Sequence, residues 1–255
     1  TATLKVLEEK FSDIHGNAEA LKAVMQAEQD RDATIFLGDS ALSGPQANET
    51  LELLQHIGPM TAIMGNHDHE VMDPSSFANW PPEWIALNEW ILERLDPSGR
   101  DFIAGFLPAG EYQVGELKAF MHHGEMGRGR PAALPDAEDQ VFEDLSAGST
   151  APLVLFGHTH VQFSRVVGER RFINPGSVGQ PRCGKLHACY GVFEDGVYDP
   201  RQVTYDPAPW LAALARIEGI QPYPEFCEWL RNGLLTGYGI GERDPWTQFA
   251  AQGYC

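Results

Sequence analysis

Five short fragments, far apart in the sequence, carry the residue types that bind metal ions. Each fragment pairs a glycine with aspartate, asparagine or histidine, and six of the nine histidines of the chain lie within them. Solvated surface histidines would not be concentrated in this way. The fragments together predict a ligand set for two metal ions, and they are Ser12-Asp13-Ile14-His15-Gly16-Asn17, Gly38-Asp39, Gly65-Asn66-His67-Asp68, His122-His123-Gly124 and Gly157-His158-Thr159-His160.

The spacing inside the fragments suggests how their side chains converge. Asp13 and His15 stand two residues apart, and so do His158 and His160. In an extended segment such residues point to the same side of the chain, so two ligand atoms can share one cation. Asp39 directly follows a predicted strand, and its carboxylate could bridge two ions.

The two remaining metal-binding positions follow from similar arguments. Asn66 offers an amide oxygen, which is a hard neutral ligand. His122 and His123 are adjacent, and alternation along a strand directs only one of them toward a site. We favour His123, which precedes Gly124.

These fragments end strands of an alternating strand and helix pattern. Such alternation indicates an α/β sandwich whose functional residues lie at the C-terminal ends of the strands. A helix is expected after Asn17, and a second helix at 48–56. Short buried strands are predicted at 34–37, 60–64, 117–121 and 152–156.

Residues 73–108 interrupt this pattern, and we interpret them as a helical insertion. It contains a tryptophan-rich helix at 83–95 and a shorter helix near 100–106. We expect a main domain at 1–205 and a C-terminal helical appendage at 206–255, packed on the same domain. The other predicted elements are strands at 111–114, 163–167, 171–173, 190–194 and 197–198, and helices at 136–146, 210–217 and 224–234.

The first strand departs from expectation, because a central strand should be apolar. Glu8, Glu9 and Lys10 precede Phe11. Either this strand is partly solvated or the early sequence is altered.

Composition limits the possible functions. A chain of 255 residues with 43% hydrophobic residues can bury one substantial core. The sequence has no apolar run of about 18 residues, so we expect no membrane span. Charged residues at 8–10 argue against a signal peptide, and we expect a cytoplasmic protein. The net charge of −18 argues against a nucleic-acid polymer as substrate and favours a small phosphorylated substrate drawn by local metal charge.

The cysteines show no paired CxxC spacing. We therefore expect free thiols in a reducing compartment. The four cysteines are Cys183, Cys189, Cys227 and Cys255.

The five fragments resemble the motifs of the calcineurin-like metallophosphoesterase superfamily. The segment 172–182, Phe-Ile-Asn-Pro-Gly-Ser-Val-Gly-Gln-Pro-Arg, is similar to one bacterial and archaeal subgroup, as are Gly44-Pro45 and Asn48-Glu49. The resemblance covers about residues 11–205. It implies a four-layer αββα sandwich of two mixed β-sheets flanked by helices.

The resemblance also implies which residues hold two divalent cations. Mixed nitrogen and oxygen ligands suit Mn²⁺ or Fe, our first expectation, and also Zn²⁺ or Ni²⁺. Asp39 would bridge the two ions. The first ion would take Asp13, His15, Asp39 and His160, and the second Asp39, Asn66, His123 and His158.

The remaining site residues are also assigned by this resemblance. His67 would be a general acid beside the leaving group, and Asp68 could orient a site histidine. Arg182 could hold a substrate phosphate or form a structural ion pair. Asn17, grouped with Arg182 at the substrate side, could anchor a ligand-bearing loop, as could Asn174. We interpret the tryptophans at 80, 84 and 90 as core or oligomer contacts rather than a substrate platform.

We therefore expect a dinuclear phosphoesterase that hydrolyses small phosphomonoesters or phosphodiesters, nucleotide-derived esters among them, by metal-activated hydroxide. A serine/threonine-type protein phosphatase is one alternative, but Leu42 and Ser43 occupy places where that subset usually has Asp and Arg. A second alternative is a non-catalytic scaffold like the retromer subunit of the same fold. A nuclease is a third, and the acidic charge argues against it. The sequence leaves the oligomeric state open.

Overall fold

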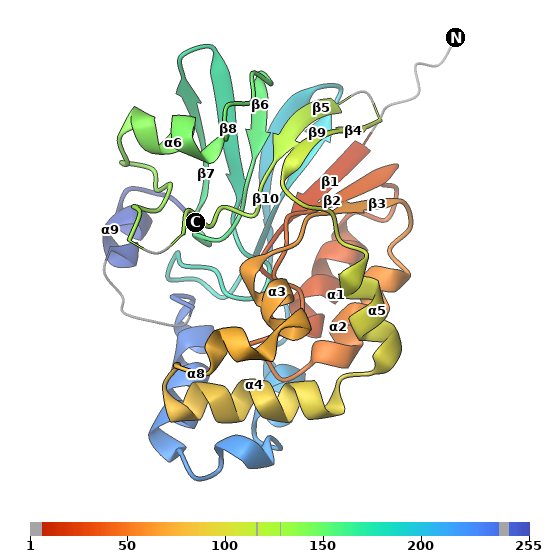
Figure 1. Ribbon diagram of the computed structural model, residues 1–255, viewed down its shortest axis with the longest axis vertical. Coiled ribbons are helices and arrows are strands. Elements are labelled where there is room, and N and C mark those ends of the chain that lie inside the picture. Colours follow the sequence, from red (N-terminus) through yellow and green to blue (C-terminus); the bar gives the residue numbers. More distant parts are fainter. Residues whose placement is uncertain (1–6, 116, 128, 240–244) are drawn as a thin grey trace.

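Two β-sheets packed face to face form the centre of the molecule (Figure 1). The computed structural model describes residues 7–115, 117–127, 129–239 and 245–255. Each sheet has five strands, in the order β10-β9-β1-β2-β3 and β4-β5-β6-β8-β7. Helices cover the outer faces of both sheets. The predicted sandwich of two mixed sheets is confirmed.

The first sheet combines a parallel half with an antiparallel half. β1 pairs in parallel with β2, and β2 with β3, whereas β9 pairs antiparallel with β1 and β10. Helices α1 and α2 connect the parallel strands and bury Leu21, Val24, Leu51 and Leu54. The bounds are β1 Leu7–Phe11, α1 Ala18–Ala27, β2 Ala33–Phe36, α2 Ala47–Gln55, β3 Met60–Ala62, β9 Ala188–Glu194 and β10 Val197–Val203.

The second sheet has parallel central strands and antiparallel edges. β5, β6 and β8 are parallel, and β4 and β7 flank them in the opposite direction. Helix α6 covers the outer face through Val141, Phe142 and Leu145. The bounds are β4 Gly110–Val114, β5 Leu117–Met121, α6 Asp139–Leu145, β6 Leu153–Leu155, β7 Gln162–Val167 and β8 Arg170–Pro175.

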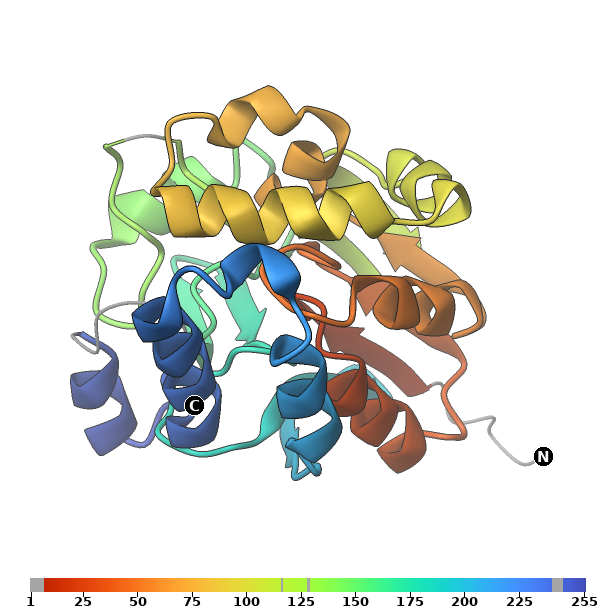
Figure 2. The same cartoon turned by 90° about the horizontal axis from the view of Figure 1, so that it is seen from below.

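The predicted insertion and the C-terminal helices pack together below the sheets (Figure 2). Leu87 and Ile91 of α4 share one apolar cluster with Trp210 of α7 and Leu230 of α8. The division of the chain at residue 205 stays a prediction. The bounds are α3 Asn66–Met72, η1 Pro74–Phe77, α4 Pro82–Arg94, α5 Pro97–Ala104, α7 Ala208–Leu214, η2 Glu218–Ile220, α8 Pro224–Thr236 and α9 Trp246–Ala251.

The strand β1 is central and its three charged residues are buried, which excludes partial solvation, one of the two alternatives that the sequence left open. Glu8, Glu9 and Lys10 are 4%, 0% and 1% exposed. The ammonium of Lys10 donates to the Glu8 backbone oxygen at 2.9 Å and lies 3.9 Å from the centre of the Phe193 ring. Its contact with the Glu8 carboxylate measures 3.2 Å. The side chains of Glu8 and Lys10 therefore satisfy each other on one face of the sheet.

Glu9 points to the opposite face of the sheet, where its carboxylate lies 3.3 Å from Nε of Arg31. Both carboxylate oxygens are buried and accept no hydrogen bond among the described residues. Burial raises the pKa of Glu9 to about 8, although the nearby Arg31 opposes this shift. The sequence could not show these partners, because one of them lies 22 residues further along the chain.

Two of the four cysteines are not the free thiols that were expected. Cys183 and Cys255 form a disulfide across 72 residues, whereas Cys189 and Cys227 are free. Two cysteines so far apart in the sequence form no short motif from which their disulfide could be predicted. In the part of the chain that the structure describes, no helix has the length and apolarity needed to cross a membrane.

Candidate metal centre

The structure brings the seven predicted metal ligands to one place, at the C-terminal ends of strands from both sheets. Potential ligand atoms lie within 4.8 Å of one another in the set Asp13, His15 and His160, and again in the set Asp39, His123 and His158. Asn66 joins the second set, because its Oδ1 lies 3.0 Å from Nδ1 of His158.

Asp39 stands between these two sets. Its Oδ2 lies 3.1 Å from Nε2 of His123 and 3.8 Å from Nε2 of His15. In the first set, Nε2 of His160 lies 3.3 Å from Oδ1 of Asp13. One carboxylate therefore contacts histidines of both sets, as the predicted bridging role requires.

The ligand loops converge by a different geometry from the one expected. Asp13, His15, Asp39, His158 and His160 have φ angles of 56°, 48°, 64°, 67° and 61°. These residues lie in the left-handed region and not in extended segments. The i, i+2 argument placed Asp13 and His15 in one set, which agrees with the structure, although a left-handed turn and not strand alternation brings them together. His158 and His160, paired by the same argument, fall into different sets.

Close packing of backbone against side chain explains one of the fragment glycines. A β-carbon at Gly65 would collide with the Asp39 carboxylate and its backbone nitrogen. Only glycine therefore lets the chain that carries Asn66 approach Asp39 so closely.

Backbone carbonyls orient three of the histidines. Nδ1–H of His15 donates to the Leu42 oxygen at 3.2 Å, and Nδ1–H of His123 donates to the Leu37 oxygen at 2.7 Å. His160 donates in the same way to the Gln180 oxygen at 2.9 Å. With Nδ1 committed to a carbonyl, Nε2 is the nitrogen that faces the centre, and in the neutral ring it presents a lone pair there.

The unprotonated nitrogens face other acceptors, which is unfavourable unless a cation lies between them. Nε2 of His15 and Nε2 of His160 are 3.2 Å apart. Oδ1 of Asp13 and Nε2 of His123 are buried and form no hydrogen bond among the described residues. Convergent imidazole nitrogens and carboxylate oxygens of this kind fit divalent cations.

The charges of the centre are strongly coupled. Burial opposes ionisation of Asp13 and Asp39, but the surrounding histidines outweigh it and hold both pKa values below the usual range. Burial also opposes the charged form of His123, yet the Asp39 carboxylate raises the pKa of that ring to about 10. For His158 and His160, burial prevails and lowers the pKa to about 3 and about 4. The carboxylates therefore remain charged and attract cations.

His67 lies at the rim of the centre, on the first turn of α3. Its ring lies edge-on to the ring of His15, with 5.1 Å between centroids, and its backbone N–H donates to Asp39 Oδ1 at 2.9 Å. Its Nδ1 contacts the Glu70 carboxylate at 2.8 Å. Burial disfavours the imidazolium, but the carboxylates of Asp39 and Glu70 outweigh it and raise the pKa of His67 to about 9.

Glu70 was not identified from the sequence as a residue of the site. Its signal is the His-x-x-Glu spacing, which brings two side chains together only on a helix. The sequence pattern places the fragment 65–68 at a strand end, whereas Asn66, His67 and Asp68 form the first turn of α3.

Asp68 does not orient a site histidine, so this prediction is wrong. Its Oδ2 accepts hydrogen bonds from the backbone N–H groups of Asp39 at 2.8 Å and Gly65 at 3.0 Å. Its Oδ1 accepts from the hydroxyl of Ser40 at 2.6 Å. At the third position of α3, the side chain turns back toward the helix start, as in a capping box. Asp68 therefore fixes the loop that presents Asp39.

The two asparagines anchor loops. Oδ1 of Asn17 caps α1 by accepting from the Ala20 N–H at 3.1 Å, and its Nδ2 donates to the Gly179 oxygen at 3.2 Å. Nδ2 of Asn174 donates to the Gly157 oxygen at 2.8 Å. Asn17 is not among the described residues that line the cavity, so its grouping with the substrate side is not supported.

A cavity of about 420 Å³ opens onto the centre. Trp80, Trp84, Trp246 and Arg182 line it together with the histidines. Trp84 and Trp90 pack against the main apolar cluster, as the core interpretation requires, but Trp80 and Trp84 also line the cavity, which that interpretation did not include. The ring of Trp80 stands at 90° to that of His67, with centroids 5.7 Å apart.

Arg182 also lines the cavity. Its guanidinium is 4.1 Å from the centre of the Trp246 ring, and its Nη1 donates to the Thr159 oxygen at 3.2 Å. Among the described residues it has no carboxylate partner within ion-pair distance, which favours the phosphate contact over the structural ion pair.

The histidines outside the centre either form a local hydrogen bond or lie at the surface. His122 accepts a hydrogen bond from the Gly124 N–H at 2.7 Å, and burial lowers its pKa to about 4. His56 and His69 are exposed. The structure thus places His123, and not its neighbour, among the candidate ligands.

Comparisons with known proteins agree with this geometry. Residues 10–195 match the family model described as a calcineurin-like phosphoesterase superfamily domain. An uncharacterized protein of Methanocaldococcus jannaschii is 29% identical over 207 residues, which cover 72% of this chain and 81% of that protein.

Two solved structures share the fold. A metallophosphoesterase from Sphaerobacter thermophilus superposes with a TM-score of 0.64 at 24% identity, over 82% of this chain and 93% of that one. A hypothetical protein from Pyrococcus horikoshii gives a TM-score of 0.75 at 19% identity, over 92% and 100% of the two chains.

Proposed function

Because the chain belongs to the calcineurin-like phosphoesterase superfamily, we propose that it is a dinuclear metal-dependent hydrolase of small phosphoric esters. The observation that carries the proposal is the position of Asp39. Its carboxylate contacts histidines of two separate ligand sets, His15 in one and His123 in the other. A single cation would not need both sets.

We assign each ion four side chains, with Asp39 shared between the two. When bound, a pair of divalent cations lowers the pKa of water, supplies hydroxide near neutral pH and offsets the charge of the phosphate. Nitrogen and oxygen donors without thiolate favour Mn²⁺ or Fe, with Zn²⁺ and Ni²⁺ as alternatives. The assigned ligands are Asp13, His15, Asp39 and His160 for one ion, and Asp39, Asn66, His123 and His158 for the other.

His67 acts as the general acid in this proposal. Its Nδ1–H donates to Glu70, so Nε2 is the nitrogen left to face the cavity and to carry the transferable proton. The carboxylates of Asp39 and Glu70 favour the protonated ring. His67 therefore protonates the departing oxygen, while Arg182, which lines the same cavity, holds a phosphate oxygen.

The surroundings of His67 indicate where the leaving group lies. Trp80 and Trp84 line the cavity beside this histidine, so the group that receives its proton departs along indole rings. Flat aromatic leaving groups, such as the base of a nucleotide-derived ester, can stack there.

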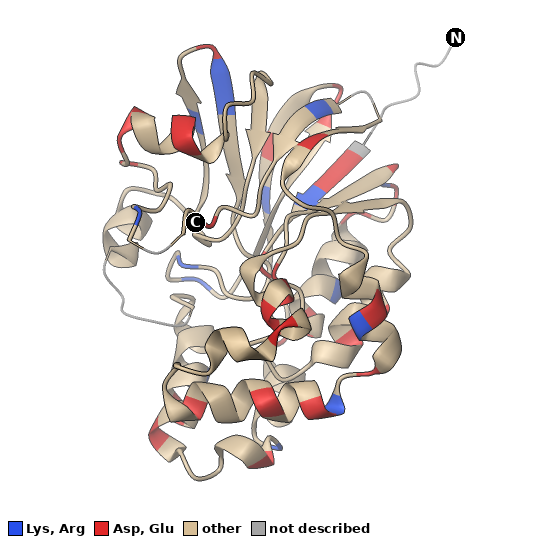
Figure 3. Cartoon of the chain, in the orientation of Figure 1, with Lys and Arg blue, Asp and Glu red and all other residues tan. Residues whose placement is uncertain are grey.

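The size of the cavity and the charge of the molecule favour a small substrate. A cavity of about 420 Å³ accommodates a small ester. Acidic residues lie along α3, α4 and α6 in Figure 3, and the net charge is −18, so a long polyanion would be repelled.

The proposal is tested by turnover of p-nitrophenyl phosphate and bis-p-nitrophenyl phosphate with Mn²⁺, Fe²⁺, Zn²⁺ or Ni²⁺. Asp39→Asn should abolish metal-dependent turnover, because it weakens the one carboxylate shared by both ligand sets. His56→Gln, an exposed histidine on α2, is the matched control and should keep the wild-type rate. No turnover by the wild type with any of these metals, or full activity of Asp39→Asn, would reject the proposal.

A further inference from the structure

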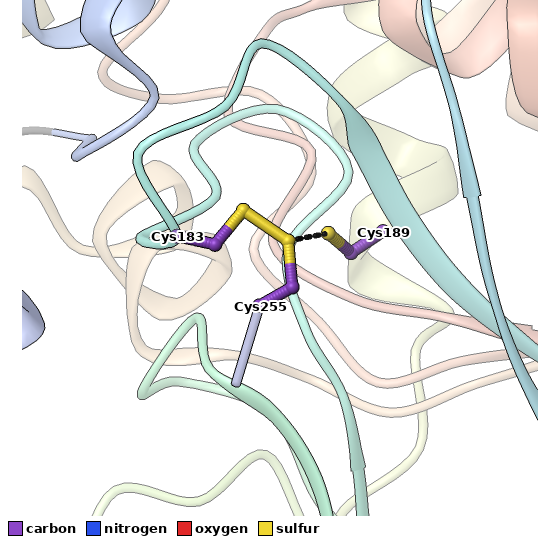
Figure 4. Close-up of side chains that lie close together, drawn as sticks. All are labelled: Cys183, Cys189 and Cys255. Carbon is purple, nitrogen blue, oxygen red and sulfur yellow. Dashed lines mark hydrogen bonds between the residues drawn. A yellow bond between two sulfur atoms is a disulfide. The ribbon is translucent and has the colours of Figure 1, made fainter. Parts of the chain in front are cut away.

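Three cysteine sulfurs that belong to neither proposed ligand set meet at one buried point (Figure 4). Cys183, Cys189 and Cys255 are 6%, 0% and 4% exposed, and their sulfurs lie within 4.8 Å of one another. Cys183 and Cys255 form the disulfide, and the Sγ atom of Cys189 lies 3.5 Å from that of Cys255. A disulfide needs only two of these residues, so the third sulfur is unexplained.

The cysteines come from three separate parts of the chain. Cys183 lies in the loop after β8, Cys189 lies in β9, and Cys255 follows α9. The backbone fixes two of them, because the Cys189 N–H donates to the Ser177 oxygen at 3.0 Å and the Cys255 oxygen accepts from the Gln162 N–H. The sulfurs are therefore brought together by the tertiary fold and not by a local turn.

We propose that the three cysteines form a thiolate site for one thiophilic cation, such as Zn²⁺, once the disulfide is reduced. A dithiol reductant supplies two electrons and two protons, breaks the bond between Cys183 and Cys255, and itself becomes a disulfide. Each of the three thiols then loses its proton to solvent as the cation binds. Three protein ligands suffice for Zn²⁺ when a small exogenous ligand takes the fourth position.

The same three sulfurs could instead exchange disulfide partners, but burial argues against this. Exchange needs Cys189 as a thiolate nucleophile, and a fully buried thiol resists ionisation. A divalent cation supplies the compensating charge that an isolated buried thiolate lacks.

The cluster lies next to the phosphoesterase site but does not depend on it. Cys183 follows Arg182, whose guanidinium packs on Trp246 of α9. The same loop supplies the Gln180 oxygen that orients His160. An occupied thiolate site would thus hold the Arg182 loop against the C-terminal segment, as the disulfide does in the oxidised protein.

The experiment is a Co²⁺ titration of the 255-residue protein after anaerobic reduction with dithiothreitol and removal of the reductant. Sulfur ligation gives an intense near-ultraviolet charge-transfer band, which the nitrogen and oxygen ligands of the other site cannot give. We expect the band to saturate at the intensity of about one sulfur-ligated Co²⁺ per chain, the capacity of a single tetrahedral site, after about three added equivalents because the proposed dinuclear centre takes up Co²⁺ as well. The oxidised protein should show no band.

Two variants separate the cluster from other thiols. Cys227→Ser removes a half-buried cysteine of α8 outside the cluster and should leave the band unchanged. Cys189→Ser keeps the two disulfide partners and should weaken both the band and the affinity for Co²⁺. The absence of the band in the reduced wild type, which requires no substitution, would overturn the proposal. So would an equal band in Cys189→Ser, and neither result would bear on phosphoesterase turnover.

Discussion

Replacing Glu70 by glutamine tests whether the charge beside His67 controls its proton. The carboxylate contacts Nδ1 of His67 at 2.8 Å, and the two side chains are only 10% and 16% exposed. Glutamine keeps the shape and one oxygen acceptor but removes the negative charge. The variant therefore changes the stability of the imidazolium while leaving the ring in place.

The magnitude follows from the nature of the hydrogen bond. A hydrogen bond to a charged group contributes about 1.5–3 kcal/mol and a neutral one about 0.5–1.5 kcal/mol. Replacing the charged acceptor by a neutral one should thus destabilise the imidazolium by about 1–2 kcal/mol, which lowers the pKa of His67 by about one unit. The rate depends on the protonated ring, so it is retained at low pH and lost as pH rises through this pKa. Glu70→Gln should move the alkaline limb of the kcat/KM profile about one unit lower, with about a tenfold loss above that limb.

The assay compares two leaving groups over a range of pH. Phenyl phosphate releases an oxygen with a pKa near that of tyrosine, about 10, which needs a proton to depart. The p-nitrophenyl ester releases a much weaker base and should depend little on His67. Glu89→Gln, an exposed residue of α4, serves as the matched control. An unshifted alkaline limb on the phenyl ester, or an equal loss on both esters, would refute the acid role of His67.

Three further predictions concern the cavity, the cations and strand β1. Trp80→Ala should raise KM for aryl esters about 5- to 150-fold relative to alkyl esters, because stacking on one aromatic ring contributes about 1–3 kcal/mol; KM values that rise equally for both classes would contradict this. Treatment with a chelator should abolish turnover and lower the melting temperature, and Mn²⁺ present at about 100 times its Kd should restore about 2.7 kcal/mol of stability for each ion bound. Glu9→Gln should change how stability depends on pH. The folded pKa of Glu9 is raised from 4.5 to about 8, so its stabilising contribution is complete below pH 4.5 and is lost as pH rises through 8. Denaturant unfolding from pH 5 to 8 should therefore show that the free energy of unfolding of the wild type falls by about 1.4 kcal/mol per pH unit relative to the variant. Parallel plots of this free energy against pH for the two proteins would show that Glu9 is already ionised.

The convergence of the candidate ligand residues was predictable because their chemistry and their neighbouring glycines are both visible in the sequence. Asp39 and His123 follow recognisable strands, and Gly65 marks a close approach of two chains. The left-handed conformation at Asp13 and His15 was not predictable from alternation, which assumes an extended chain.

Contacts between distant segments account for what the sequence did not show. Nothing near Trp80 or Trp84 indicates that these rings line a cavity, because that depends on how the insertion packs below the sheets. The buried charges of β1 likewise depend on partners such as Arg31 and Phe193, which only the folded chain brings close. The roles of Asp68 and Glu70 became clear only once residues 66–72 were known to form a helix.

The positive φ angles of the proposed ligands limit which substitutions the centre can accept. Aspartate and histidine are among the few side chains that tolerate the left-handed region, where other L-residues lose about 1–2 kcal/mol. The residues at Asp13, His15 and Asp39 must therefore supply a metal-binding atom and adopt a left-handed backbone at the same time. Exchanging such a residue for glutamate or cysteine would keep a donor atom yet disfavour the turn that presents it. Changing the metal preference of this centre by ligand replacement would require redesigning its loops at the same time.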